Sequence, residues 1–266
     1  MLGLDLEGFR PLALEECGAL IAAAALSYDP ADTTVKRRAA ETLAGELQIS
    51  DATLAESRRR LADFRRSKAR IPMSGVVLAG GASRRMGTSK AELTLKGKTL
   101  LDRQVDKLRV LGIRDILLSR KNCRSIPGTR VVVDEYPDHG PLGGLYSCFR
   151  SARHSCCLVL SVDTPLVPTA ALANLCRLHT KGGMTCLRHA GTPEPLIGVY
   201  DTDLKDLIGP LIKEGGAAVR TLERLAPCAY FDYLGPAEYL LNCNTPQQFM
   251  QVRQLAERYA RHGIIL

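Results

Sequence analysis

The sequence predicts a three-layer α/β fold, in which helices cover both faces of a mostly parallel sheet, preceded by a small all-helical N-terminal segment. From residue 75 onward, short apolar runs alternate with stretches of helical periodicity, the pattern of folds that alternate strands and helices. A glycine-rich loop and an acidic loop follow two of these runs, and α/β folds bind ligands where parallel strands end. Residues 1–72 have helical patterns alone, so we predict a helical segment over 1–72 and an α/β domain over 73–266.

Local signals place each element in turn. In the first segment, helices are expected at residues 11–27, 32–47 and 51–68. Asp32 can cap the second of these helices, and Pro72 closes the segment. Strands, which are short apolar runs between turn residues, are expected at residues 76–79, 115–119, 130–133, 156–162, 184–188, 196–200 and 228–233. Helices are expected between and after these strands, at residues 100–111, 142–152, 168–179, 204–213, 217–225 and 246–259. Gly112 stops the first of them, and the helices over 168–179 and 246–259 have proline in the first turn.

Composition limits the classes of function. No apolar run approaches the roughly 20 residues that span a membrane, and the apolar stretch over residues 19–26 is too short and too acidic at its start for a secretory signal. Nine cysteines without a C-x-x-C pair predict reduced thiols in the cytoplasm, with Cys156 and Cys157 packed in the core.

The charge distribution indicates the kind of partner. The net charge is +8, and residues 1–72 hold 11 basic and 11 acidic side chains, so the excess lies in the α/β domain. A basic α/β domain fits anionic small molecules as well as nucleic acid, but 5 % aromatic residues and no Trp disfavour base stacking. We therefore expect phosphorylated metabolites, with no nucleic acid and no membrane. For the arginine-rich end of the helix over 51–68, three interpretations remain open, in this order of preference: a solvated face, a docking surface for an acidic partner, and a nucleic-acid contact.

The loop after the first strand of the α/β domain is the strongest signal for phosphate. Gly80 and Gly81 leave the backbone open to a ligand, and Arg84, Arg85 and Lys90 add positive charge beside it. Exposed amides and cations at a strand end are a common phosphate site in α/β folds. The spacing matches neither the P-loop nor the G-x-G-x-x-G dinucleotide pattern.

Two acidic residues follow other strands. Asp163 ends an apolar run and precedes Pro165, so it either caps a turn or holds Mg²⁺, which takes one or two carboxylates with phosphate oxygens and water. Asp134 precedes a loop with Gly140, Gly143 and Gly144 that allows close contact with a ligand, or is an ordinary turn residue.

Other polar residues are ambiguous. His139 is expected to be a surface residue rather than a catalytic base, and no Ser-His-Asp or Cys-His arrangement is evident. In the run Asn242 to Pro246, capping by Asn244 or Thr245 explains one polar residue and leaves Asn242 as a candidate ligand contact. Glu194 before Pro195 is similarly ambiguous.

Five motifs in one order resemble the molybdenum cofactor guanylyltransferases, within the nucleotidyltransferase superfamily, over about residues 75–260. They are LAGGASRRMGTSKAEL at 78–93, HGPLGGL at 139–145, SVDTPLVP at 161–168, EPLIGVY at 194–200 and NCNTPQQF at 242–249. Three features separate this family from the cytidylyltransferases, which usually have LAAG: the second glycine of LAGG, the GPLGG motif and the NxNTP motif. The resemblance implies the Rossmann-like nucleotidyltransferase fold and does not cover residues 1–72.

The resemblance also implies a reaction and its residues. Molybdenum cofactor (molybdopterin) and GTP would give the guanine dinucleotide cofactor and pyrophosphate, with Mg²⁺. Asp163 would hold the metal, Lys90 and Arg85 would act on the phosphates in catalysis, and Asn242 and Asn244 would border the pterin. The guanine nucleotide would lie against Leu78, Ala79, Gly80, Gly81, Lys90, Asp134 and Asp163.

One position departs from the family pattern, and several activities remain open. The family often has Asn after the second strand of the domain, where this chain has Ser119 and, further on, Asn122. The alternatives are a cytidylyltransferase for the same cofactor, a sugar-phosphate nucleotidyltransferase, or a non-catalytic carrier that delivers the cofactor to a molybdoenzyme. Residues 1–72 are a candidate docking segment for such an acceptor enzyme or its chaperone.

Overall fold

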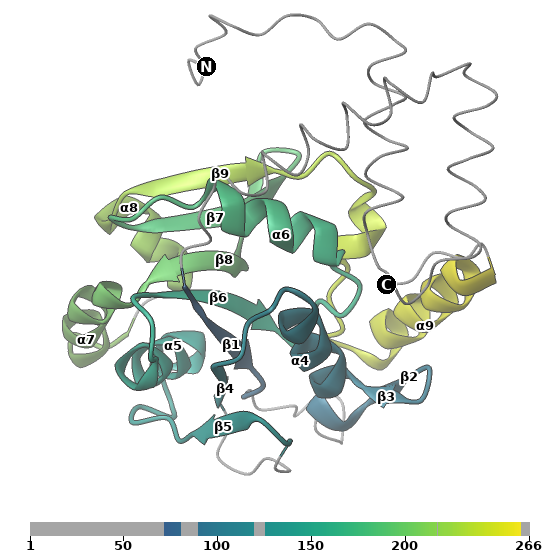
Figure 1. Ribbon diagram of the computed structural model, residues 1–266, viewed down its shortest axis with the longest axis horizontal. Helices are drawn as coiled ribbons and strands as arrows, with labels where there is room; N and C mark the ends of the chain where they lie inside the picture. The colour runs from purple at the N-terminus through teal and green to yellow at the C-terminus, as the bar shows by residue number, and fades with distance from the viewer. Residues whose placement is uncertain (1–71, 81–89, 120–125, 217, 262–266) are drawn as a thin grey trace, which may run out of the picture. The chain divides into compact units, whose positions relative to one another are not determined.

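A seven-stranded sheet forms the centre of the fold (Figure 1). The computed structural model describes residues 72–80, 90–119, 126–216 and 218–261. The strands of this sheet are β1 (Ser74–Leu78), β4 (Ile116–Ser119), β5 (Thr129–Val132), β6 (Cys156–Ser161), β7 (Met184–His189), β8 (Thr192–Asp201) and β9 (Cys228–Asp232). They stand in the order β5-β4-β1-β6-β8-β7-β9. All neighbours are parallel except β8, which runs antiparallel to β6 and β7, so the predicted mostly parallel sheet is confirmed.

Helices cover both faces of the sheet, which makes three layers (Figure 1). One hydrophobic core packs against α4 (Leu100–Val110), α6 (Thr169–Leu178) and α9 (Pro246–Arg261). The other packs against α5 (Gly140–Ser151), α7 (Lys205–Lys213) and α8 (Leu222–Leu225). Val77 belongs to the first core and Val76 and Leu78 to the second, because successive side chains of a strand point to opposite faces. A strand buried on both faces is the usual centre of a parallel sheet.

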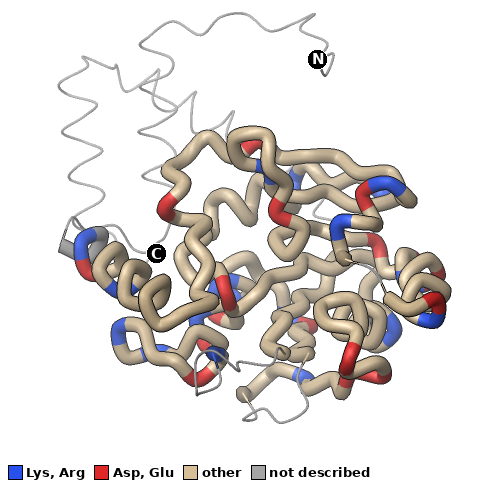
Figure 2. Tube along the Cα trace, turned by 180° about the vertical axis from the view of Figure 1, so that it is seen from behind, with Lys and Arg blue, Asp and Glu red and all other residues tan. Residues whose placement is uncertain are grey.

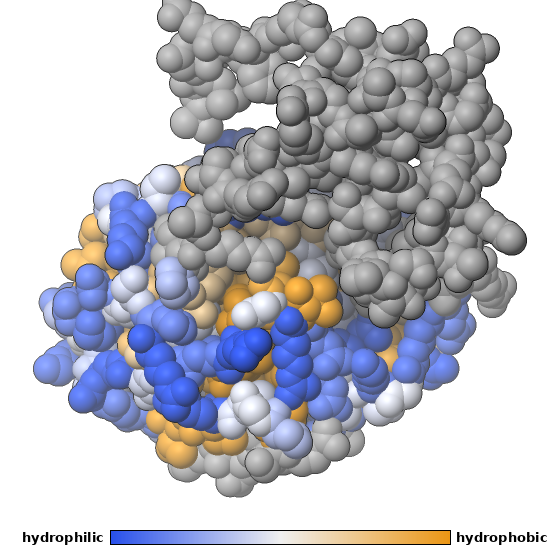
Figure 3. All heavy atoms as spheres, viewed as in Figure 1, coloured by the Kyte–Doolittle hydropathy of each residue, from blue (hydrophilic) through white to orange (hydrophobic). Residues whose placement is uncertain are grey.

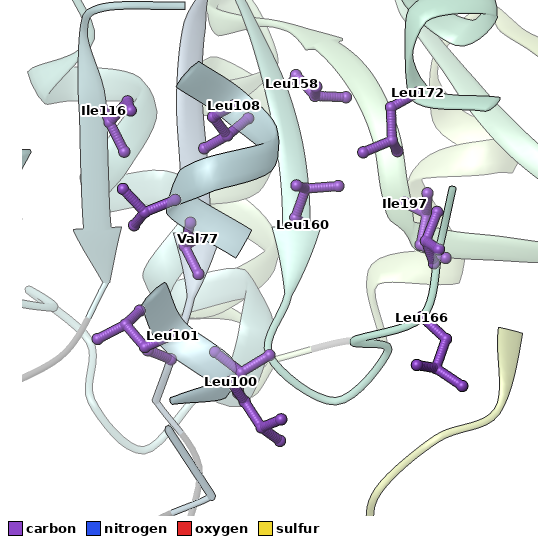
Figure 4. Packing of buried hydrophobic residues seen from close by; sticks show 14 of the residues in the cluster. Val77, Leu100, Leu101, Leu108, Ile116, Leu158, Leu160, Leu166, Leu172 and Ile197 are labelled. Carbon is purple, nitrogen blue, oxygen red and sulfur yellow. The ribbon is translucent and has the colours of Figure 1, made fainter. Parts of the chain in front are cut away.

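Helix α4 lies directly on the central strands. β1 and β6 are buried along their whole length, and a Cβ at Gly75 would come within 2.6 Å of Leu108 Cδ1. Figure 4 shows Leu108 beside Val77 and Leu160 of these two strands. Through this contact α4 packs on β1, next to β6, and the candidate residues follow the carboxyl ends of both strands.

Most predicted elements are confirmed within a few residues, with two differences. A hairpin of β2 (Thr94–Leu95) and β3 (Lys98–Thr99) is absent from the sequence-based prediction, because two-residue strands show no periodicity. Its turn places Lys96 at φ 53° and Gly97 at φ 75°, left-handed values typical of two-residue hairpin turns. The expected helix over 217–225 is instead a short 3-10 turn (Val219–Thr221) followed by α8.

The predicted helices over residues 1–72 lie outside the described residues, so the division of the chain near residue 72 stays a prediction. No helix in the described part is long and apolar enough to cross a membrane. Basic and acidic residues are scattered over the described trace, with both signs on the same parts of the domain (Figure 2). On the face in Figure 3, hydrophilic side chains predominate, with apolar ones between them.

Candidate active site

Four strand ends bring the candidate residues to one edge of the sheet. In the parallel register, Leu78 at the end of β1 pairs with Ser119 of β4 and with Ser161 of β6. β5 continues the sheet beyond β4 and pairs Val132 with Ser119. The glycine-rich loop, Asp134 and Asp163 all follow these ends, so the structure brings together residues that lie far apart in the sequence.

On the β4 side, the backbone of Gly80 lies beside Ser119 and Asp134. Ala79 N donates to Ser119 O at 3.3 Å, and Ser119 Oγ donates to Asp134 Oδ1 at 2.8 Å. A Cβ at Gly80 would lie 3.4 Å from Ser119 O and 3.9 Å from Asp134 Oδ2. Gly80 itself is exposed. A ligand at this edge can therefore contact its backbone and, beside it, Asp134 Oδ2, the carboxylate oxygen to which Ser119 does not donate.

Burial and the hydrogen bond from Ser119 act in opposite directions on the pKa of the Asp134 carboxyl. Burial raises the pKa of the carboxyl, and the hydrogen bond from Ser119 opposes that rise, because a donor to the charged form stabilises it. A half-buried carboxylate with one free oxygen is suited to accept hydrogen bonds from the N–H groups of a ligand.

Two glycines of the GPLGG motif serve helix packing. Gly143 and Gly144 lie in α5, and Cβ atoms there would overlap Tyr136 O and Ser119 Oγ respectively. Our expectation that they leave backbone open to a ligand is wrong, because protein atoms already occupy that space. α5 begins at Gly140 rather than at 142, since Pro141 fits the first turn of a helix. His139 holds the N-cap position without a capping hydrogen bond from its side chain, and it packs edge-on against Tyr136.

On the β6 side, Lys90, Asp163 and Asn244 form one hydrogen-bonded cluster. Lys90 Nζ donates to Asp163 Oδ1 at 3.2 Å and to Asn244 Oδ1 at 2.6 Å. The side chains of Lys90 and Asp163 are 19 % and 25 % exposed, so both are sheltered and still within reach of a ligand. The three residues come from a 3-10 turn (Lys90–Glu92), the loop after β6 and the loop before α9.

The loop over residues 242–245 is tied to both the site and α9. Cys243 N donates to Asp163 O at 2.8 Å, and burial, then the Asp163 charge, raise the pKa of the Cys243 thiol to about 12. Thr245 Oγ1 accepts from Gln248 N, and Gln248 Oε1 accepts from Thr245 N, a capping box. Capping by Thr245 is confirmed, which leaves the Asn244 side chain to Lys90; no hydrogen bond joins Asn242 to another described residue.

Some predicted residues lie outside the described part of the chain. These are Gly81, Arg84 and Arg85 of the glycine-rich loop, and Asn122. Among the described residues, no group of three or more His, Cys, Asp or Glu side chains could hold a metal ion. The cluster at Asp163 therefore offers one carboxylate, one amide oxygen and one ammonium group, a set suited to phosphate with a substrate-borne cation.

Comparison with known proteins decides the family. The sequence profile of the MobA-like NTP transferase domain matches residues 75–228, more than half of the chain. The chain belongs to this family. It is therefore a nucleotidyltransferase, and the resemblance noted in the sequence is confirmed.

Relatives and solved structures agree with the MobA-like assignment. A probable molybdenum cofactor guanylyltransferase of Chloroflexus aggregans is 32 % identical over 198 residues, covering 68 % of this chain and 93 % of the relative. A molybdopterin-guanine dinucleotide biosynthesis protein A of Archaeoglobus fulgidus has a similar fold, with a TM-score of 0.58, 21 % identity, and coverage of 70 % of this chain and 100 % of the other. A Mycobacterium tuberculosis protein solved with manganese has a TM-score of 0.53 at 18 % identity, with coverage of 69 % and 98 %.

Sequence reasoning missed three residues that support the site of this MobA-like transferase. Ser119 was noted only as a departure from the family pattern, yet its hydroxyl is the partner of Asp134. From the sequence, Gln104 and Lys107 have no predicted role beyond the helix expected over 100–111, but both reach the loop that carries Asp163. A polar side chain on the apolar face of a helix is the signal that could have found them.

Proposed function

We propose that this chain transfers GMP from GTP to molybdopterin, in the form of molybdenum cofactor, and releases pyrophosphate. The observation that carries the proposal is the cluster in which Lys90 is hydrogen-bonded to Asp163 and to Asn244, 73 and 154 residues away in the sequence. The cluster lies beside the end of β6, and β6 is the direct neighbour of β1, the strand that precedes the glycine-rich loop. Family membership and the name of the relative from Chloroflexus aggregans support the choice of substrates.

The nucleotide half of the proposed site lies over β1 and β4. The backbone of Leu78, Ala79, Gly80 and Gly81 would lie against the guanine nucleotide. Asp134, with Oδ1 held by Ser119, would accept hydrogen bonds from nucleotide N–H groups through its other oxygen.

The phosphate half lies over β6. Lys90 would neutralise the phosphates of GTP, with Arg85 as a second cation from the glycine-rich loop. Asp163 would hold Mg²⁺, and its sheltered but accessible carboxylate fits an ion that takes one or two carboxylates together with phosphate oxygens and water. When bound, the metal would withdraw negative charge from the phosphates.

The proposed reaction needs positioning and charge rather than a protein nucleophile. An oxygen of the terminal phosphate of molybdopterin forms a bond to the α-phosphorus of GTP, and the bond from that phosphorus to the bridging oxygen breaks. Pyrophosphate leaves with the electron pair. The attacking phosphate is already ionised, so no general base is required, and Lys90 stabilises the charge that develops on the leaving group.

The pterin half would lie at the loop before α9, with Asn242 and Asn244 at its border. Asn244 is already hydrogen-bonded to Lys90 of the phosphate half, so this lysine would lie between the phosphates of GTP and the pterin side of the site. An amide oxygen and an amide N–H₂ group suit a pterin ring, which has both donors and acceptors along its edge.

Two further proposals concern partners and location. Residues 1–72 would dock an acceptor molybdoenzyme or its chaperone, and unchanged cofactor delivery after their deletion would refute this. We also propose a cytoplasmic location, since the thiols of Cys156 and Cys157 are buried in the core and intracellular proteins keep such thiols reduced.

The test is pyrophosphate release by the full chain supplied with molybdenum cofactor, Mg²⁺ and either GTP or CTP. Release with GTP that is lost in Asp163→Ala, while that variant keeps its thermal unfolding transition, is the expected result. Release with CTP instead would identify a cytidylyltransferase, and a sugar phosphate that replaces molybdenum cofactor as acceptor would identify the wider class. Cofactor that is bound and passed on without any release would identify a carrier.

A further inference from the structure

Two buried side chains of α4 hold the main chain on both sides of Asp163. Gln104 is fully buried, and its Nε2 donates to Ser161 O at 2.6 Å and to Thr164 O at 3.1 Å. Lys107 is 5 % exposed, and its Nζ donates to Pro165 O at 2.6 Å. The three carbonyls come from the residues that bracket Asp163, so α4 fixes the turn that carries this carboxylate.

The cost of burying these groups makes packing alone a poor explanation for them. An amide or an ammonium group taken out of water is unfavourable unless it is hydrogen-bonded. Burial, with the nearby charge of Arg103 as a second cause, lowers the pKa of Lys107 to about 7. The other buried positions of the same helix face are largely aliphatic, at Leu100, Leu101, Val105 and Leu108. Gln104 and Lys107 interrupt that face where it meets the Asp163 loop.

The opposite side of the same turn is held as well. Asp163 O accepts from Cys243 N at 2.8 Å, and Asp163 N donates to Ser161 Oγ at 3.2 Å. The Asp163 side chain points to Lys90 and stays 25 % exposed. The turn thus combines a fixed main chain with an accessible carboxylate, as in metal sites where outer residues orient the ligand.

We propose that Gln104 and Lys107 are positioning residues that set the Asp163 carboxylate for a divalent cation by holding the carbonyls on either side of it. This rests on the proposed metal role of Asp163. Gln104 and Lys107 act on the cation only through the main chain of the Asp163 turn. Their loss therefore weakens binding of the metal and leaves the guanine contacts over β1 and β4 in place.

The experiment measures Mn²⁺ binding to the full chain by the electron paramagnetic resonance signal of free Mn²⁺. The protein is in excess over guanosine α,β-methylene triphosphate, so that free nucleotide does not take up Mn²⁺, and the methylene bridge of this analogue cannot be cleaved. The variants are Gln104→Leu and Lys107→Met, which remove the donors, and Lys107→Gln, which keeps an N–H donor without the charge. Asp163→Asn is the reference for a lost metal ligand. Leu108→Ala is the matched control, since Leu108 is buried on the same helix but packs on Gly75 of β1.

Loss of either donor is expected to raise the Kd for Mn²⁺ by about tenfold or more, as for other outer residues of metal sites. Lys107→Gln should restore most of the affinity, and Leu108→Ala should bind Mn²⁺ as the unaltered chain does although its thermal unfolding temperature falls. Unchanged Mn²⁺ binding in Gln104→Leu and Lys107→Met, or an equal loss in Leu108→Ala, overturns the proposal. Unchanged binding in Asp163→Asn refutes the metal role of Asp163 itself. If Gln104→Leu does not fold, Gln104→Asn, too short to reach both carbonyls, takes its place.

Discussion

Replacing Lys90 by Met removes the charge at the centre of the proposed site while keeping most of the side-chain volume. At the 3.2 Å between Lys90 Nζ and Asp163 Oδ1, two unit charges attract by about 5 kcal/mol at an effective dielectric constant of about 20. A phosphate oxygen at a similar distance gains a comparable attraction, part of which is already present before the reaction. Loss of a single donor to developing charge costs about 3–4 kcal/mol, so we expect kcat to fall by roughly 10²–10³.

The assay is steady-state pyrophosphate release with molybdenum cofactor and Mg²⁺ at saturation. The matched control is Lys98→Met, because Lys98 also forms an ion pair, with Asp106 at 2.6 Å, but on the exposed β2–β3 hairpin. Exposed pairs contribute little to stability, so the control should keep its rate and its unfolding temperature. If Lys90→Met released pyrophosphate within about threefold of the unaltered chain, the charge-stabilising role of Lys90 would be refuted.

Three further predictions concern the supports of the site. Ser119→Ala removes the hydrogen bond that opposes the raised pKa of Asp134. The KM for GTP should therefore rise by about three- to tenfold, the equivalent of about 1 kcal/mol. Ser119→Thr, which keeps a hydroxyl donor, is the control, and an unchanged KM in Ser119→Ala would contradict this prediction. Gly144→Ala forces a Cβ onto Ser119 Oγ and should lower the free energy of unfolding by about 1–3 kcal/mol, measured by urea denaturation; an unchanged free energy of unfolding would show that the helix shifts to make room. Burial lowers the pKa of Lys107 to about 7 in the folded chain, below its unfolded value of about 10.4. Between these two pH values the unfolded chain keeps a proton on Lys107 that the folded chain has lost. The free energy of unfolding relative to Lys107→Met should therefore rise by up to about 4 kcal/mol from pH 7 to pH 10; a difference that stays flat with pH would show that the lysine is not desolvated.

The sequence predicts the sheet well because its signals are local. The apolar runs that become β1 and β6 are buried on both faces, so their composition alone marks them as central strands. The candidate residues after these strands can be predicted for the same reason: Gly80 and Asp163 each lie two positions beyond a strand end, and parallel strands bring such positions to one edge.

What the sequence cannot predict depends on contacts between distant segments. Gly143 and Gly144 look like ligand-binding glycines until the neighbouring strand is in place and Tyr136 and Ser119 occupy the space beside them. The hydrogen bonds of Gln104 to the loop after β6 join residues 57 and 60 positions apart. A polar side chain on the apolar face of α4 can be seen in the sequence, but no local pattern tells which distant carbonyls it reaches.

The most direct test of the proposed function is the nucleotide dependence of pyrophosphate release when molybdenum cofactor is supplied. Base choice is the point on which the proposed site and its alternatives differ most. We predict release with GTP that depends on Mg²⁺ and on the cofactor, and little or none with CTP. Equal or faster release with CTP, or release from GTP that does not need the cofactor, would contradict the assignment of this chain as a molybdenum cofactor guanylyltransferase.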